Sequence, residues 1–257
     1  METERILAET CVRHVEWLNQ IDSTNNRALQ MLATSDREIP FLIGSDEQTA
    51  GRGRGVNRWW GAHGSLMFSL GVDMPALGLT PTSWPRFSLL TGLAVSETLI
   101  SLLPSTRIGL KWPNDVWIDG RKVCGILIEQ SDRSTDRLVI GVGLNVNNSF
   151  QDASVEQRQI ATSMTDAASG RQFSRTEVLI TFLNCWQVLA AELADGELNL
   201  VERWSHLCVL SGNPVILTDG HRETTGICAG IDDDGSLLLR TAFSLERCYA
   251  GTVRLLN

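Results

Sequence analysis

The first part of the chain predicts alternating strands and helices from its hydrophobic pattern. Residues 14–21 alternate as a strand does, and the polar residues 22–25 are typical of the start of a helix. A short apolar strand is predicted at residues 41–45. Residues 65–72 are apolar on both faces, which indicates a strand at the centre of a sheet. The longest pattern with helical spacing covers residues 85–103.

The middle of the chain predicts strands joined by turns, followed by two helices. Asp119-Gly120 is typical of a two-residue hairpin turn. The strand-like runs around and after it are residues 107–111, 116–118, 123–130 and 137–142, with the polar stretch 131–136 between the last two. Helices are predicted at residues 176–193, capped by Ser174, and at residues 198–207.

The pattern changes at residues 211–214, Ser-Gly-Asn-Pro. Short strand-like runs follow, separated by turns at Asp219-Gly220 and Asp234-Gly235, and they cover residues 215–218, 224–231 and 237–240. We therefore predict an α/β body followed by a small all-β barrel.

Composition and charge narrow the class of protein. Of the 257 residues, 43% are hydrophobic and 20% charged, as in ordinary globular proteins. The chain has no uninterrupted apolar run that would span a membrane and no secretory signal, so we expect a cytoplasmic protein. The net charge of −8 argues against a general binder of nucleic acids or anionic membranes. None of the six cysteines forms a C-x-x-C pair, and we expect reduced, mostly buried thiols.

Lysine is unusually rare in this chain. Lys and Arg together number 22, but only Lys111 and Lys122 are lysines. One explanation is chance within a biased composition. The other is that this segment needs a compact ammonium, in a place where a planar guanidinium does not fit.

A glycine- and arginine-rich segment, GRGRGVNRW, covers residues 51–59. Glycines let backbone amides approach a ligand, arginines neutralise anionic oxygens, and Trp59 can stack on a flat ring. The segment suits an anionic small molecule, especially a nucleotide, although it is neither a P-loop nor a G-x-G-x-x-G motif. A flexible turn without a ligand explains the composition equally well.

A second cluster begins with KWPND at residues 111–115 and continues with Lys122. The proline cannot continue a central strand, so Asn114 and Asp115 stand at a corner from which side chains point into a site. Hairpin geometry can bring Lys122 near Lys111 or Asp115. The alternative is a surface hairpin with a weak Lys–Asp ion pair.

Two weaker signals accompany these clusters. GVGLN at residues 141–145 places two glycines after a predicted strand, where they permit close backbone approach, and Asn145 offers an amide. Glycines at the end of a strand, with no ligand nearby, explain this pattern as well. Helix capping explains STN at residues 23–25 fully.

Taken in order, these motifs resemble those of the biotin–protein ligases. The resemblance covers residues 11–147 and rests on STN at 23–25, Gln48, GRGRG at 51–55, Arg58-Trp59, KWPND at 111–115, KVCGILIE at 122–129 and GVGLN at 141–145. It implies an α+β fold, in which residues 1–209 form a catalytic domain with a mixed β-sheet flanked by helices, similar to class II aminoacyl-tRNA synthetases. An SH3-like β-barrel is implied for residues 210–257. The implied form is monofunctional, without the DNA-binding domain of the family's regulatory members.

The resemblance implies a two-step acyl transfer. Biotin and ATP, with Mg²⁺, give biotinyl-5′-AMP and pyrophosphate, and a lysine of a biotin carboxyl carrier domain then displaces AMP. The implied partner is this carrier domain, from acetyl-CoA carboxylase or a related carboxylase, with no DNA and no membrane; a homodimer is compatible with it. Two anions must meet in the first step, so cationic groups are needed, and the reactive anhydride must be kept from water by a closing loop.

The resemblance also implies roles for single residues. The implied catalytic group is Lys122, Arg54, Asp115 and Asn114, with Asp115 as the candidate metal ligand. Contacts with biotin are expected from Ser23, Thr24, Asn25, Gln48, Gly51, Arg52, Gly53, Lys122 and Gly125. Contacts with ATP or the adenylate are expected from Arg54, Arg58, Trp59, Lys111, Asn114 and Asn145.

Three other interpretations are compared with this one. A lipoate–protein ligase resembles the family in fold and reaction, but the Gly/Arg loop joined to KWPND favours biotin. A non-catalytic module that binds nucleic acid is disfavoured by the net charge. A biotin-binding regulator without turnover is disfavoured by Lys122 and Asp115.

Overall fold

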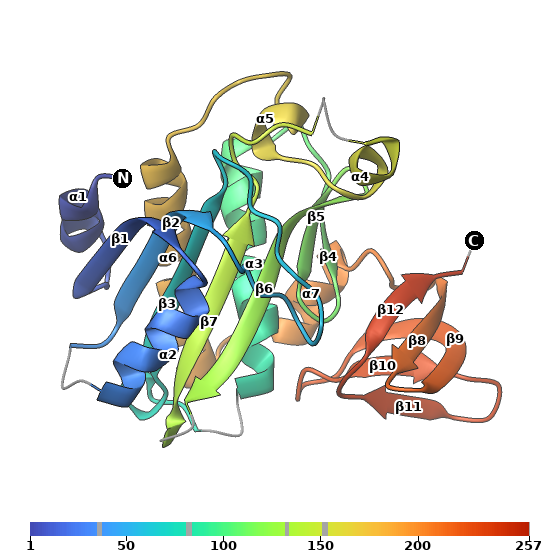
Figure 1. Cartoon of the computed structure of the whole chain (residues 1–257). Helices are drawn as coiled ribbons and strands as arrows, with labels where there is room; N and C mark the ends of the chain where they lie inside the picture. The colour runs from blue at the N-terminus through green and yellow to red at the C-terminus, as the bar shows by residue number, and fades with distance from the viewer. Residues whose placement is uncertain (35–37, 81–83, 132–133, 151–153, 257) are drawn as a thin grey trace.

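Two β-sheets divide the chain in the computed structural model, which describes residues 1–34, 38–80, 84–131, 134–150 and 154–256. Figure 1 shows the larger sheet with helices on both faces and the smaller sheet beside it at the C-terminal end. The α+β prediction, with a mixed sheet flanked by helices, is confirmed.

The larger sheet has seven strands in the order β1-β2-β3-β7-β6-β5-β4. Its strands are β1 (His14–Ile21), β2 (Phe41–Gln48), β3 (Leu66–Asp73), β4 (Ile108–Lys111), β5 (Asp115–Ile118), β6 (Arg121–Ser131) and β7 (Ser134–Leu144). Among the strands that the structure describes, β1 and β2 are the one parallel pair, and a crossover helix joins them. The predicted central strand, β3, lies between β2 and β7 and is buried on both faces.

Of two predicted connections in this sheet, the turn at residues 119–120 is confirmed and the separating stretch at residues 131–136 is not. Asp119-Gly120 does form the turn between β5 and β6, and both residues have the positive φ angles of 47° and 79° that such a turn requires. The polar stretch predicted to separate the next two strands is largely strand, since Ser131 already pairs with Ser134. Residues 132–133 of that stretch lie outside the described part.

The helices are α1 (Thr3–Glu9), α2 (Thr24–Thr34), α3 (Trp84–Leu102), α4 (Val155–Ile160), α5 (Met164–Ala167), α6 (Arg175–Ala194) and α7 (Leu200–Leu207), with a 3-10 turn, η1, at Pro75–Leu77. Ser174 caps α6 as predicted, because its side chain accepts a hydrogen bond from the Glu177 amide. The short helices α1, α4 and α5 were not predicted, since each is too short to show a helical period.

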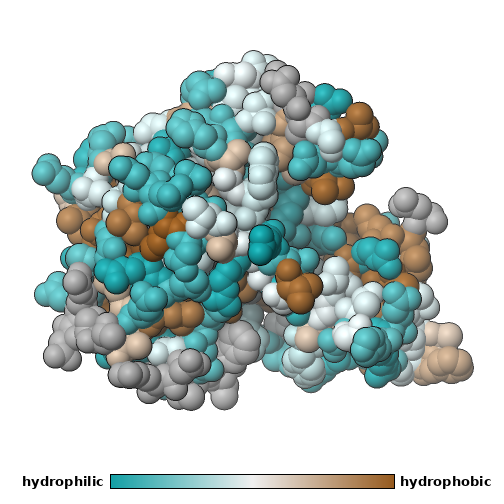
Figure 2. Space-filling view, viewed as in Figure 1, coloured by the Kyte–Doolittle hydropathy of each residue, from teal (hydrophilic) through white to brown (hydrophobic). Residues whose placement is uncertain are grey.

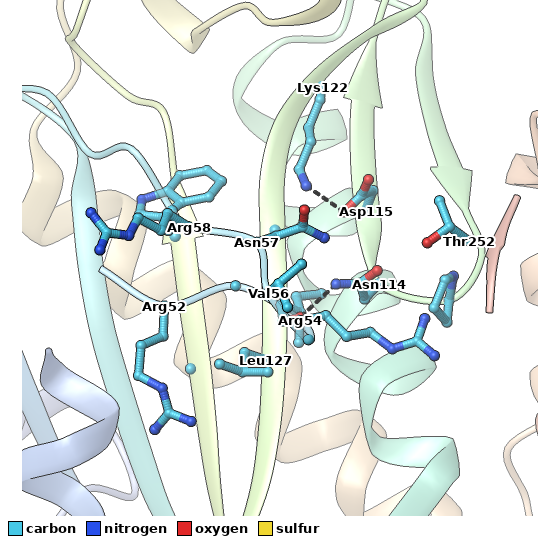
Figure 3. Close-up of a pocket in the computed structure, with 18 of the residues that line it drawn as sticks. Arg52, Arg54, Val56, Asn57, Arg58, Asn114, Asp115, Lys122, Leu127 and Thr252 are labelled. Atoms are coloured by element: carbon cyan, nitrogen blue, oxygen red, sulfur yellow. Dashed lines mark hydrogen bonds and ion pairs between the residues drawn. The ribbon is translucent and has the colours of Figure 1, made fainter. Parts of the chain in front are cut away.

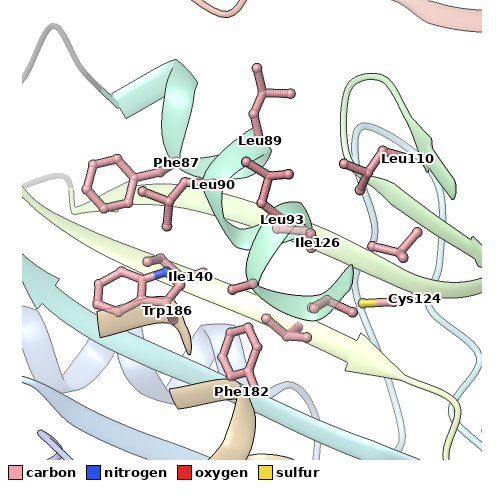
Figure 4. Close-up of a cluster of buried hydrophobic side chains, with 14 of the residues drawn as sticks. Phe87, Leu89, Leu90, Leu93, Leu110, Cys124, Ile126, Ile140, Phe182 and Trp186 are labelled. Carbon is pink, nitrogen blue, oxygen red and sulfur yellow. The ribbon is translucent and has the colours of Figure 1, made fainter. Parts of the chain in front are cut away.

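The main core lies between the sheet and the helices α3 and α6 (Figure 4). Phe87, Leu90 and Leu93 of α3 meet Trp186 of α6 over the apolar face of β6 and β7. By length and composition alone α6 could cross a membrane, but half of its most apolar 18-residue stretch is buried inside the protein, as in a core helix. On the opposite face of the sheet, α2 packs on a smaller apolar cluster.

The smaller sheet is antiparallel, in the order β11-β10-β9-β8-β12. Its strands are β8 (Pro214–Asp219), β9 (Arg222–Ile231), β10 (Leu237–Arg240), β11 (Leu245–Cys248) and β12 (Thr252–Leu255). In the described residues β11 and β12 form opposite edges, so barrel closure stays a prediction. The two sheets are tied together by the buried Trp112 indole, which donates a hydrogen bond to the Gly235 carbonyl at 3.1 Å.

Candidate active site

A cavity of about 610 Å³ opens on the α2 face of the large sheet and is bounded by segment 51–59 and by the C-terminal sheet. Its volume is in the range of sites for small organic molecules. In Figure 2 teal and white residues lie within the notch between the two sheets, and brown hydrophobic residues border it, most clearly on the C-terminal part. Every predicted site residue lines this cavity except Gly51 and Asn145.

Lys122 and Asp115 form an ion pair at the base of the cavity, with Nζ 2.6 Å from Oδ1 (Figure 3). A β-bulge brings them together. Asp115 pairs with Gly125 and Val116 with Cys124, but Trp117 then pairs with Lys122 rather than with Val123. The extra residue turns Lys122 to the cavity face of the sheet, while Val123 is fully buried on the other face.

Lys111, the other lysine of the chain, also lines the cavity. Its ammonium lies 5.0 Å from the centre of the Trp117 ring, within the range of a cation–π contact. Burial lowers the pKa of Lys111, and this effect outweighs the attraction of Asp115. Both side-chain amines of the protein therefore lie in one cavity, which favours a functional cause for the scarcity of lysine.

Segment 51–59, which we call the flap, is a small hairpin over the sheet. The Trp59 amide donates to the Gly51 carbonyl at 3.1 Å, and the Gly53 amide donates to Asn57 at 2.9 Å. At the tip Gly55 has a positive φ of 63°, and Val56 is fully exposed. Backbone hydrogen bonds therefore hold the root of the flap, while Val56 at its tip is exposed to solvent. This arrangement suits a movable cover.

Arg54 connects the flap to the C-terminal sheet. Its Nη1 donates a hydrogen bond of 2.7 Å to the Gly251 carbonyl, just before β12. Burial lowers the pKa of Arg54, partly offset by the carboxylates of Asp219 and Asp115. Gly251 has a φ of 122°, and a Cβ atom there would meet the Thr218 carbonyl at 2.9 Å, so this acceptor needs a glycine.

The glycines of GVGLN were predicted to follow a strand, but they lie within β7. They do permit close approach, yet the approaching groups belong to the protein. The Trp59 indole packs directly against Gly143, and the Asn25 amide packs directly against Gly141. Trp59 also lies over Gly125, and the Lys122 ammonium is 5.9 Å from its ring centre.

The start of α2 carries the predicted biotin contacts in a hydrogen-bonded network. The Thr24 amide donates to Gln48 Oε1 at 2.8 Å, which joins α2 to β2. Ser69 of β3 donates to Asn25 Oδ1 at 2.6 Å. Ser23, Thr24 and Asn25 are all buried at the cavity wall. Ser69 has no signal in the sequence, because a single serine in an apolar strand has no distinguishing pattern.

Two predicted amides are engaged with the protein. Asn114 Nδ2 donates to the Ile126 carbonyl at 2.8 Å, which fixes the corner between β4 and β5. Asn145 is buried behind the cavity, where its Nδ2 donates to Thr162 at 3.1 Å and its Oδ1 accepts from Asn148 at 3.1 Å. Asn145 therefore does not face the cavity.

The C-terminal sheet contributes wall residues that were not predicted, at positions 218–220 and 251–253. The sequence shows Asp219-Gly220 only as a turn. Among the described residues no cluster of three or more His, Cys, Asp or Glu side chains could hold a metal ion. The carboxylates in the cavity wall are Asp115 and Asp219, and Mg²⁺ typically takes one or two carboxylates together with substrate phosphates.

Two family models match the chain. The model described as the biotin/lipoate A/B protein ligase family matches residues 17–145, and the model described as the biotin protein ligase C terminal domain matches residues 210–256. Among solved structures, the biotin protein ligase from Aquifex aeolicus in complex with biotin and ATP is similar, with a TM-score of 0.82 and 26% identity. That similarity covers 95% of this chain and 100% of the other.

Curated relatives agree with these matches. The bifunctional ligase/repressor BirA of Bacillus spizizenii is 30% identical over 250 residues, which cover 96% of this chain and 75% of the relative. The biotin–[acetyl-CoA-carboxylase] ligase of Paracoccus denitrificans is 31% identical over 232 residues, covering 87% of this chain and 92% of that one. The chain therefore belongs to the biotin/lipoate A/B protein ligase family.

Proposed function

We propose that this protein is an ATP-dependent biotin–protein ligase. Its cavity activates biotin to biotinyl-5′-AMP and passes the biotinyl group to a lysine of a biotin carboxyl carrier domain, of acetyl-CoA carboxylase in particular. The names of the relatives and the biotin and ATP in the similar structure support biotin over lipoate. The observation that carries the proposal is that Lys122, Asp115 and the flap bound one cavity.

In the first step the biotin carboxylate attacks the α-phosphorus of ATP, and pyrophosphate leaves. Both reactants are anionic, so a cation at the point of contact lowers the barrier. We assign this role to Lys122, whose ammonium is held by Asp115 at 2.6 Å. The ammonium then bridges the biotinyl carbonyl and the phosphate oxygens of the adenylate.

In the second step a carrier lysine attacks the biotinyl carbonyl carbon, and AMP leaves with the electrons of the broken C–O bond. The attacking amine must lose a proton, and the Asp115 carboxylate is our candidate to accept it. Between the steps the flap excludes water from the anhydride, with Arg54 at its tip. The hydrogen bond from Arg54 to Gly251 supports a flap that closes against the C-terminal sheet.

We assign the nucleotide side of the cavity to Trp59, Arg58 and Lys111, which offer a ring face and two cations. Asp115 would hold Mg²⁺ together with the nucleotide phosphates, and the ion would neutralise their charge. We further assign residues 1–209 to the catalytic domain and residues 210–257 to a C-terminal domain that closes the cavity.

The test is an isotope exchange between pyrophosphate and ATP, run with biotin or with lipoate, followed by transfer to an isolated carrier domain. We expect exchange and carrier labelling with biotin only. Exchange with lipoate alone would establish the rival ligase, and no exchange with either vitamin would overturn the proposal.

A further inference from the structure

Glu129 of β6 is a partly buried carboxylate for which the proposed chemistry has no use. Its side chain is 19% exposed, and both of its oxygens accept hydrogen bonds. Oε1 accepts from Arg52 Nη2 of the flap root at 2.6 Å, and Oε2 accepts from Asn25 Nδ2 at the start of α2 at 2.8 Å. One carboxylate thus joins two separate parts of the proposed biotin site.

Arg52 is held by more than this ion pair. Its Nη1 donates to Asn26 Oδ1 at 2.9 Å, and Asn26 in turn donates to Asp22 at 2.7 Å. In Figure 3 the Arg52 side chain points away from Lys122 and Asp115. The guanidinium therefore anchors the flap root to β6 and α2, separately from the hydrogen bond by which Arg54 holds the tip to Gly251.

The surroundings of Asn25 orient its amide. Its Oδ1 accepts from Ser69 at 2.6 Å, and the amide packs against Gly141, where any Cβ atom would collide with it. Its Nδ2 faces two acceptors, Glu129 Oε2 at 2.8 Å and the Leu127 carbonyl at 3.4 Å, so the nitrogen donates toward Glu129. Because Asn25 and Arg52 both donate, position 129 needs a group with two acceptor oxygens and no donor, and an ionised carboxylate meets this requirement.

We propose that Glu129 is a positioning residue for biotin, which acts by fixing the flap root through Arg52 and the start of α2 through Asn25. This inference rests on the proposed function and adds a residue to it. A glutamine at position 129 has the same size, but its NH₂ group is a hydrogen-bond donor. It would face the donor of either Arg52 or Asn25, so one of the two hydrogen bonds would be lost. The flap root and Asn25 then lose their common anchor, while Lys122 and Asp115 stay in place.

The test compares Glu129→Gln with Glu16→Gln in biotin-dependent pyrophosphate exchange. Glu16 is a matched control, because it holds Arg27 of α2 through two hydrogen bonds of 2.9 and 3.0 Å and, within the described residues, forms no hydrogen bond or ion pair with the flap. We expect Glu129→Gln to raise the KM for biotin about tenfold, the size of a lost charge-assisted hydrogen bond, with kcat changed less than about twofold. Glu16→Gln should leave both constants unchanged.

A double-mutant cycle separates positioning from general packing. In an Arg52→Ala background Glu129→Gln should raise the KM for biotin by a clearly smaller factor than in the wild-type chain. Equal factors in the two backgrounds, or an unchanged KM in Glu129→Gln, overturn the inference. If Glu129→Gln does not fold, Glu129→Asp decides, because it keeps the charge but shortens the reach to Arg52 and Asn25: a raised KM for biotin supports the inference and an unchanged KM overturns it. Failure of the proposed function is distinct, since the wild-type chain would then show no exchange.

Discussion

The Lys122 ammonium lies 2.6 Å from the Asp115 carboxylate because β6 has a bulge, one extra residue opposite Val116 and Trp117 of β5. In a regular ladder Lys122 would pair with Ile118, whose side chain is fully buried in the core. The bulge instead gives Lys122 the same face as Asp115. Bulges next to functional sites commonly turn a side chain in this way.

This relationship makes Lys122→Arg a sharp test of the first step. The planar guanidinium is larger than the ammonium and cannot occupy the same position beside Asp115. We expect adenylate formation to fall by about 10²-fold or more, the cost of losing a group aimed at developing charge. Pyrophosphate exchange measures the effect, and a thermal melt close to that of the wild type checks the fold. Near-normal exchange would remove Lys122 from the mechanism.

Arg54→Gly tests the flap. The substitution removes the hydrogen bond to Gly251 and the bulk of the flap tip, so the adenylate should still form but leave early. The readout is biotin on the lysines of an unrelated protein added to the reaction, measured by mass spectrometry. Labelling of that bystander should rise severalfold, whereas the rate of pyrophosphate exchange should change little. Unchanged retention of the adenylate would contradict a covering role for Arg54.

Gly143→Ala tests whether the position of Trp59 matters for the nucleotide. A methyl group at Gly143 would occupy the space of the indole and push it from β7. We expect a KM for ATP raised about tenfold, the value of one lost stacking contact, and a nearly unchanged KM for biotin. In a Trp59→Ala background, Gly143→Ala should raise the KM for ATP little further. An equal increase in both backgrounds would show that Gly143 acts without Trp59.

Lys111→Met should stabilise the fold at neutral pH. Burial lowers the pKa of Lys111, so in the folded chain the charged amine is disfavoured relative to the unfolded chain. This penalty is complete below the folded pKa and disappears as the pH rises toward the ordinary value of 10.5. We expect the melting temperature to rise by about 1–3 °C at pH 7, and the difference to shrink toward pH 10. An equal or lower melting temperature at pH 7 would contradict this account.

The same substitution should impair activity, because we assign Lys111 to the nucleotide. A raised KM for ATP in a more stable protein is the expected trade between stability and function at a charged site. The effect on ATP is read in the exchange assay at saturating biotin.

Much of the fold could be predicted from local patterns. The strands at residues 14–21 and 237–240 have the predicted boundaries, because turn residues stand directly beside them. The bulge in β6 could not be predicted, since a shift of one residue in register depends on packing across the whole sheet. The strands β11 and β12 are only four residues long and carry no clear alternation.

In the candidate site, too, local patterns predicted some features, while features that depend on distant contacts could not be predicted. The glycines of β7 correctly indicated close approach, but their sequence could not distinguish a ligand from the Trp59 and Asn25 side chains. The wall at residues 218–220 and 251–253 depends on contacts between distant segments, which leave no local pattern. The ion pair of Glu129 with Arg52 joins residues 77 positions apart and is hidden from the sequence for the same reason.

The confinement of both lysines to the cavity has a practical consequence. An acylating dye or cross-linker that targets primary amines finds no side chain to modify on the described surface outside this site. Beyond the label on the α-amino group of Met1, the mass of the intact chain would therefore report the protection of Lys111 and Lys122, and with it occupancy, without a radioactive substrate.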